Sequence, residues 1–78
     1  TEENGKTVDA SKAEVDLTID YFRYMAGWAR RYEGEVLPSD RPNENILVLK
    51  KPIGIVGGIV PWNFPMFIFA RKVAPAFV

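Results

Sequence analysis

The sequence reads Ile53-Gly-Ile-Val-Gly-Gly-Ile-Val-Pro-Trp-Asn-Phe-Pro65, a run that indicates a strand leading through a turn into a helix. Continuous apolar and β-branched residues over 53–60 are typical of a strand that is covered on both faces. Pro65 suits the first position of a helix, where its missing N–H is no loss. Asn63 puts a polar side chain into this turn, which is costly unless the residue has a function. Its neutral amide can donate hydrogen bonds to developing negative charge at any pH.

A long helix is predicted before this run. Ser11-Lys-Ala-Glu14 has the form of a capping box that starts the helix, and Glu33-Gly34 fits its end after about Tyr32. Thr1 to Lys6 looks like the tail of an earlier helix, with Gly5 just past its end. The long helix carries two apolar stripes, which imply two packing neighbours. The stripes are Val15, Ile19, Phe22, Ala26 and Ala29, and Leu17, Tyr21, Tyr24 and Trp28.

The remaining segments predict an α/β fold. Residues 38–43 have the composition of a turn, and residues 45–50 form a short β-prone run that Lys51-Pro52 closes. A mostly apolar helix runs from Met66, and Pro75 is expected to bend or end it. The predicted order is therefore helix, strand, strand, loop, helix.

Composition limits the classes of function. The chain has 78 residues, of which 47% are apolar, and this is more than so short a chain can easily bury. There is no Cys and no His, which excludes disulfides and the usual zinc sites, and we expect no metal. Ten basic and ten acidic residues balance, which argues against nucleic acid or an anionic membrane as partner. Because the chain starts at Thr1 and stops at Val78 inside an apolar run, we expect a piece of a larger polypeptide.

Several motifs together resemble the aldehyde dehydrogenase superfamily, whose members oxidise aldehydes to acids with NAD(P). The most specific is Ile59-Val-Pro-Trp-Asn-Phe-Pro65 with its glycine-rich run upstream. Four weaker motifs follow the family's order and approximate spacing. They are Glu3-Asn-Gly-Lys6, Tyr24-x-Ala-Gly-Trp28, Pro52-x-Gly54 and Arg71-Lys72-x-Ala-Pro75-Ala76. Within this family the chain resembles the bacterial lactaldehyde or glycolaldehyde dehydrogenases.

The resemblance implies a role for the turn. In the family a Cys thiolate attacks the aldehyde, hydride passes to the nicotinamide, and a Glu activates the water that hydrolyses the thioester. Asn63 would then donate to the oxyanion, whereas on the residues alone it could equally cap the following helix. Main-chain groups of Ile59, Val60, Pro61, Trp62 and Asn63 would contact NAD or NADP, with NAD favoured. Gly57-Gly58 could either approach the cofactor or allow tight packing of a helix.

The resemblance also implies a substrate surface. Phe64, Ile68 and Arg71 fall on one face of the predicted helix, and the family lines its aldehyde tunnel from that face. Arg71 would bind a hydroxyl or carboxylate of a small polar aldehyde. The alternative is a cation near the end of its helix, which the helix dipole favours.

By this resemblance the chain is a fragment of a Rossmann-like cofactor-binding domain with part of a β oligomerisation arm. Residues 1–44 would be the helical part of the domain, 45–52 an arm strand, and 53–78 the first strand and helix of the dinucleotide-binding core. The expected partners are the rest of the same polypeptide and further copies in a cytoplasmic homodimer or homotetramer. A non-catalytic module of the same fold is one alternative. A membrane span over the uncharged residues 53–70 is another, which Pro61, Asn63 and Pro65 disfavour.

Overall fold

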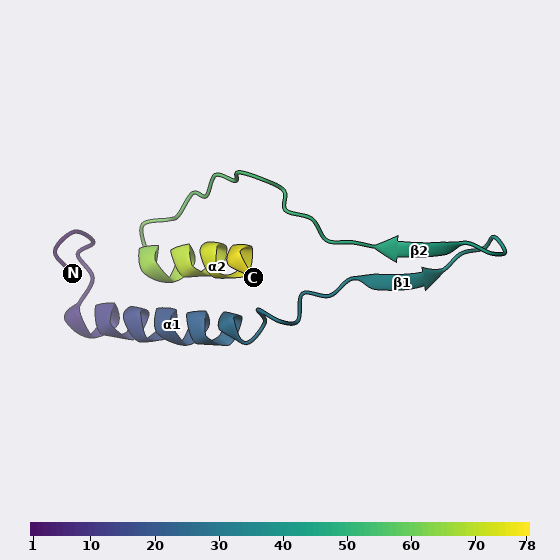
Figure 1. Cartoon of the computed structure of the whole chain (residues 1–78). Coiled ribbons are helices and arrows are strands. Elements are labelled where there is room, and N and C mark those ends of the chain that lie inside the picture. Colours follow the sequence, from purple (N-terminus) through teal and green to yellow (C-terminus); the bar gives the residue numbers. More distant parts are fainter.

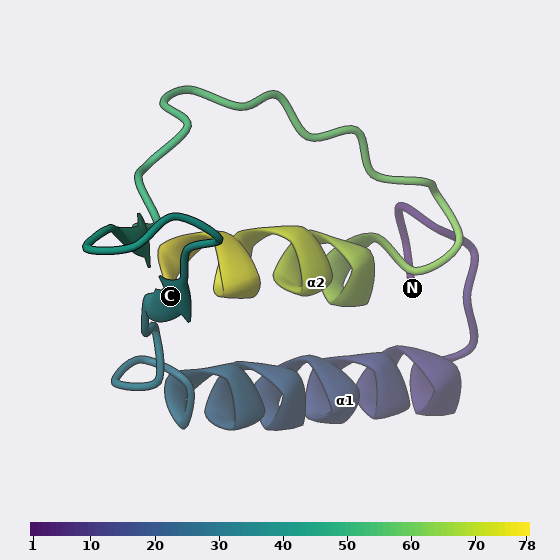
Figure 2. The same cartoon turned by 90° about the vertical axis from the view of Figure 1, so that its right-hand side faces the viewer.

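Four elements make up the computed structural model, which describes all 78 residues. They are α1 (Val8–Ala26), β1 (Glu35–Pro38), β2 (Asn45–Val48) and α2 (Pro65–Phe77). The two helices lie side by side, and the hairpin of β1 and β2 projects away from them (Figure 1). The extended segment between β2 and α2 returns from the hairpin to the end of the helix pair where the N-terminal turn also lies (Figure 2). The order of elements is that of an α/β chain, as predicted, without a Rossmann sheet inside these residues.

Helix α1 begins earlier and ends earlier than predicted. Thr7 is its N-cap, because the Thr7 Oγ1 accepts from the Ala10 N–H at 3.3 Å. The predicted capping box is therefore wrong, and Ser11 and Glu14 lie inside the helix. At the other end Gly27 is the C-cap, and the next N–H groups bond only three residues back, which turns the chain out of the helix.

The N-terminal residues form a turn whose hydrogen bond and Gly5 conformation are those of a helix end. Gly5 has a φ of +74°, a conformation that costs glycine nothing, and its N–H donates to the Thr1 carbonyl at 2.8 Å. Gly5 thus has the left-handed geometry expected of a residue just past the end of a helix. The turn brings residues 1–6 back over the start of α1.

Small and polar side chains form the seam between the two helices. Glu14 and Thr18 of α1 and Ala70 and Ala74 of α2 are buried there, and the Tyr21 ring meets the Phe67 ring edge-to-face at 5.9 Å. The two predicted apolar stripes lie on either side of this seam. Within this chain most of their large members remain exposed: Val15, Leu17, Ile19, Phe22, Tyr24 and Trp28.

The hairpin contains one strand that was predicted and one that was not. β2 occupies most of the predicted run 45–50 and pairs antiparallel with β1, in the register Glu35 to Val48 and Pro38 to Asn45. The turn predicted over 38–43 joins them. β1 was missed, since Gly34 looked like a helix end. A Cβ on Gly34 would lie 2.5 Å from the Val48 carbonyl oxygen, so this glycine permits the close approach of the two chains.

The strand predicted over 53–60 is not formed in this chain. Ile53, Ile55 and Ile59 are 94%, 106% and 90% exposed, and no backbone group of these residues has a backbone hydrogen-bond partner. A strand needs a neighbour for its N–H and C=O groups, and neither strand of the hairpin lies beside this segment.

The buried core is very small. Ala70 and Ala74 are its only buried apolar residues, and no large side chain is fully buried. The radius of gyration is 18.9 Å, whereas about 12 Å is usual for a compact domain of this length. No helix is long and apolar enough to cross a membrane. Further protein surface is thus needed to cover the apolar side chains.

We predict that these 78 residues, produced alone, do not fold cooperatively, because so little apolar surface is buried. Far-UV circular dichroism during a urea titration should show a broad, non-sigmoidal change, and sedimentation should show aggregates or an expanded chain. A sigmoidal transition of a soluble, compact monomer would contradict this prediction.

Candidate functional site

The site centres on the turn that enters α2. Pro61 and Pro65 restrict the backbone on either side of Trp62, Asn63 and Phe64. Phe64 is the N-cap residue, and its side chain caps nothing. Asn63 is exposed, and its side chain makes no hydrogen bond within the chain. The alternative in which Asn63 caps α2 is therefore wrong, and its amide remains available to a ligand.

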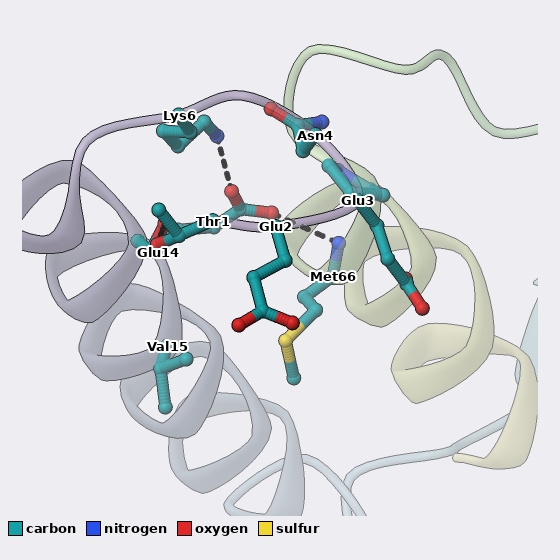
Figure 3. Close-up of a pocket in the computed structure, with 10 residues that line it drawn as sticks. Thr1, Glu2, Glu3, Asn4, Lys6, Glu14, Val15 and Met66 are labelled. Carbon is teal, nitrogen blue, oxygen red and sulfur yellow. Dashed lines mark hydrogen bonds and ion pairs between the residues drawn. The ribbon is translucent and has the colours of Figure 1, made fainter.

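Glu14 of α1 caps α2 instead. Its Oε1 accepts from the backbone N–H of Met66 at 2.9 Å and of Phe67 at 3.2 Å. Its Oε2 accepts from Lys6 Nζ, so one carboxylate joins α1, the N-terminal turn and α2 (Figure 3). The carboxylate is buried, since the Glu14 side chain is only 6% exposed.

The ionisation of Glu14 follows from these contacts. Burial by itself raises the pKa of the Glu14 carboxyl. The hydrogen bond from Lys6, those from the backbone N–H of Phe67 and Met66, and the charge of Lys6 together outweigh burial and hold the pKa below its ordinary value of 4.5. Glu14 is therefore a carboxylate at neutral pH, which suits the positive end of the α2 dipole.

The N-terminal turn contacts the residues immediately before and after Asn63. Asn4 Nδ2 donates to the carbonyl of Trp62, and the Lys6 ammonium lies 3.9 Å from the centre of the Phe64 ring. A hollow of about 520 Å³ lies between this turn and the starts of both helices. Its lining includes Asn4, Lys6, Glu14 and Met66 (Figure 3).

The residues predicted to contact the cofactor follow one another in this non-helical segment. Ile59 and Pro61 are exposed, Val60 is half-buried, and the Trp62 ring is 79% exposed. Their backbone groups make no hydrogen bonds to other backbone groups. Gly57 has no neighbour within van der Waals reach of an added Cβ, whereas at Gly58 such a Cβ would lie 3.7 Å from the Lys72 side chain of α2.

The predicted substrate residues lie at the start and in the middle of α2, where Phe64 is the N-cap and Ile68 and Arg71 are helical. Phe64 and Arg71 are exposed and Ile68 is half-buried. The Arg71 guanidinium lies 5.8 Å from the centre of the Phe67 ring and makes no salt bridge. Because α2 continues past Pro75 to Phe77 and has no basic residue in its last turn, the alternative that Arg71 serves the helix end is wrong.

Sequence reasoning missed the three residues that hold the turn. The sequence pattern assigns Glu14 to a capping box of its own helix, and it marks Asn4 and Lys6 only as parts of a family motif. One signal was present: α2 has no acidic residue in its first turn and no capping side chain before it, so its N–H groups needed an acceptor from elsewhere. No group of three or more His, Cys, Asp or Glu side chains lies close enough together to hold a metal ion.

Comparison with known proteins identifies the fold around this turn. Residues 1–78 match the model of the aldehyde dehydrogenase family over their whole length. The chain belongs to the aldehyde dehydrogenase family. The resemblance based on the Pro-Trp-Asn-Phe-Pro run is thereby confirmed.

Individual aldehyde dehydrogenases show close similarity over a limited region. Lactaldehyde dehydrogenase of Escherichia coli strain K12 is 59% identical over 75 residues, which are 96% of this chain and 16% of that protein. D-glyceraldehyde dehydrogenase (NADP(+)) of Thermoplasma acidophilum is 49% identical over 75 residues, 96% of this chain and 15% of that protein. The crystal structure of the Escherichia coli lactaldehyde dehydrogenase superimposes with a TM-score of 0.88 at 57% identity, covering 96% of this chain and 16% of that one. The chain thus spans about one-sixth of these relatives.

We predict that Glu14→Gln in the complete protein lowers stability by about 1.5–3 kcal/mol at pH 7, because the charge that meets Lys6 is lost. The pKa of the Glu14 carboxyl is lower in the folded state, so its contribution is fully present above pH 4.5 and is lost as the pH falls through the lowered value. Thermal unfolding midpoints of wild type and variant should therefore differ by a constant amount from pH 6 to 8 and converge below pH 4.5.

Asp20→Asn is the matched control. Asp20 lies on the same helix and its exposed carboxylate pairs only with Arg23, at 3.6 Å, so its removal should shift the midpoint little. If the difference in unfolding midpoint between wild type and Glu14→Gln persisted or grew on acidification, the pKa of the Glu14 carboxyl would not be lowered in the folded state.

Proposed function

We propose that this chain is part of an NAD(P)-dependent aldehyde dehydrogenase that oxidises an aldehyde to a carboxylic acid, with Asn63 as the oxyanion donor. The observation that carries the proposal is the uncommitted Asn63 amide at the turn into α2. The exposed Asn63 amide has no hydrogen-bond partner within the chain, so its N–H groups are free to donate to a ligand oxygen. Family membership supplies the reaction type.

The usual anion-binding groups at this place are already occupied. The N-terminus of a helix attracts anions through its free N–H groups. In α2, Pro65 has no N–H, and the N–H groups of Met66 and Phe67 donate to Glu14. The negative charge of Glu14 also offsets the helix dipole at this point. Within the proposal, Asn63 rather than the end of α2 is the group of this chain that stabilises an oxyanion beside the turn.

The cofactor suits the backbone of 59–62. Apart from the Trp62 carbonyl, which accepts from Asn4, these peptide groups have no partner in the chain, so a ribose or nicotinamide amide can bond to them. The segment also lies just before the turn that holds Asn63, which would place the cofactor and the reacting carbon side by side. NAD or NADP would accept the hydride, and we favour NAD. One relative is named as NADP-dependent, so the preference is a separate question for this protein.

The remaining catalytic groups belong to the rest of the polypeptide. The chain has no Cys, and so the thiol that attacks the aldehyde must come from outside these residues. No motif of the chain identifies a general-base Glu, and we place that residue in the rest of the polypeptide as well. Within the proposal, this chain provides the oxyanion donor, one wall of the cofactor site and one wall of the substrate site.

The substrate is proposed to be a small polar aldehyde, bound on the side of α2 that carries Phe64, Ile68 and Arg71. Arg71 has an exposed guanidinium with no carboxylate partner, and guanidinium groups bind hydroxyl and carboxylate oxygens strongly. The two relatives named above act on lactaldehyde and D-glyceraldehyde, which are both 2-hydroxyaldehydes. A 2-hydroxyaldehyde is therefore the substrate class that we propose.

The hairpin is proposed to be part of the oligomerisation arm of a homodimer or homotetramer. All residues of its two strands are exposed, and the strands contact neither helix. Exposed strand edges pair readily with another sheet.

We predict that Asn63→Ala in the complete enzyme lowers kcat by about 10²–10³, because one oxyanion donor is lost. The dissociation constant of NAD, measured by fluorescence titration, should stay unchanged, since the peptide groups of 59–62 remain. Single-turnover kinetics keep the measurement on the chemical step.

Asn63→Asp is the decisive second variant. Asp caps helices as well as Asn does, so a capping role would survive this change. An oxyanion donor would not, because a carboxylate donates nothing and repels the developing charge. Normal kcat in either variant would remove Asn63 from the mechanism.

We predict that Arg71→Leu raises KM for lactaldehyde by about tenfold or more, because charge-assisted hydrogen bonds to its oxygen are lost. The KM for propanal, which lacks the hydroxyl, should change far less. Arg71→Lys retains the charge without the forked geometry of the guanidinium. Its KM for lactaldehyde should lie between those of the wild type and of Arg71→Leu. Equal effects on both aldehydes would show that Arg71 does not contact the hydroxyl.

A further inference from the structure

Glu14 and the Asn63 turn are joined by contacts that bridge a long stretch of sequence. On one side of Asn63, Asn4 Nδ2 donates to the Trp62 carbonyl. On the other side, Glu14 Oε1 accepts from the backbone N–H of Met66 and Phe67. Asn63 therefore sits in a short bridge whose two ends are fixed to the N-terminal turn and to α1.

The bridge itself is stiff. Pro61 and Pro65 lock two of its φ angles, and Phe64 in its middle packs its ring under the Lys6 ammonium at 3.9 Å. The first N–H groups of α2 are all accounted for, because Pro65 has none, Glu14 takes the next two and Ile68 donates to the Phe64 carbonyl at 2.9 Å. A stiff bridge moves as one body with the start of α2, and Glu14 fixes that start relative to α1.

An oxyanion donor works only when it is held at a precise position relative to the substrate oxygen. The donor must lie about 2.7–3.1 Å from the oxygen as charge develops, and a displacement of about 1 Å costs on the order of 10²-fold in rate. The seam between α1 and α2 consists of small side chains such as Ala70, Ala74 and Thr18 and of the Tyr21–Phe67 ring pair, and none of these contacts binds a backbone group at the start of α2. The directed hydrogen bonds of Glu14 supply the missing constraint.

We propose that Glu14 is a positioning residue for Asn63, which fixes the oxyanion donor by holding the N-terminus of α2 against α1. This inference rests on the proposed function, in which the Asn63 amide meets the substrate oxygen. Glu14 itself touches neither substrate nor cofactor, and it acts through the backbone N–H groups of Met66 and Phe67.

The test is a double-mutant cycle in the complete enzyme, with the single-turnover rate measured with lactaldehyde and NAD. Glu14→Ala should lower the rate by about tenfold or more, with the NAD dissociation constant unchanged. In the Asn63→Ala background the same change should lower the rate by less than about twofold, because the group that Glu14 positions is gone. If Glu14→Ala lowers the rate by the same factor with and without Asn63, the inference is overturned, because Glu14 would then act on a group other than Asn63.

Two further variants separate positioning from stability. Glu14→Gln keeps an oxygen that accepts from Met66 and Phe67 but loses the charge that meets Lys6. It should keep the rate within about threefold of wild type while it lowers the unfolding midpoint. Glu14→Asp keeps the charge and is one methylene shorter, so it cannot reach both partners, and its rate should fall. A Gln variant as slow as Ala, or an Asp variant at the wild-type rate, would overturn the inference.

Controls keep the two proposals distinguishable. Asp20→Ala removes an exposed carboxylate of α1 and should leave rate and midpoint within error of wild type. If Glu14→Ala yields no soluble enzyme, Glu14→Asp and its combination with Asn63→Ala complete the same cycle. An unchanged rate in Asn63→Ala alone would overturn the proposed function and this inference with it. If Asn63→Ala lowers the rate and the double variant loses the product of the two single factors, only the inference is overturned.

Discussion

One buried carboxylate holds this structure together. Glu14 accepts hydrogen bonds from two backbone N–H groups of α2 and from Lys6, and it thereby joins three segments that are far apart in the sequence. Burying a charge is expensive unless it is paired and hydrogen-bonded, and here both conditions hold. Apolar packing contributes little in comparison, because Ala70 and Ala74 are the only buried apolar residues of the chain.

The same carboxylate explains how the candidate site is arranged. Helix α2 has no cap of its own, and Glu14 takes over that task from the neighbouring helix. The Asn63 side chain is thereby left without a structural duty inside the chain. A polar group that the fold does not use, held between two prolines on a fixed turn, is what a binding site needs. Family membership then gives this group a chemical context.

Much of the apolar surface of this chain is exposed. The stripes of α1, the extended residues 53–60 and the hairpin all remain uncovered. In relatives the matching region is about one-sixth of the protein. The peptide groups of 53–61, which have no backbone partner, fit the same picture, since they suit either a neighbouring strand or a ligand.

The sequence by itself determined the features that depend on near neighbours in the chain. The Pro-Trp-Asn-Phe-Pro run identified the family and the start of α2 at Pro65, because Pro geometry is local. The turn over 38–43 and the strand at Asn45–Val48 follow from local composition in the same way. Only the tertiary structure decided that Glu14 caps α2 and that Asn4 binds Trp62, because these contacts join residues more than 50 positions apart. It also decided that 53–60 forms no strand here, because strand formation depends on a partner that no local pattern contains.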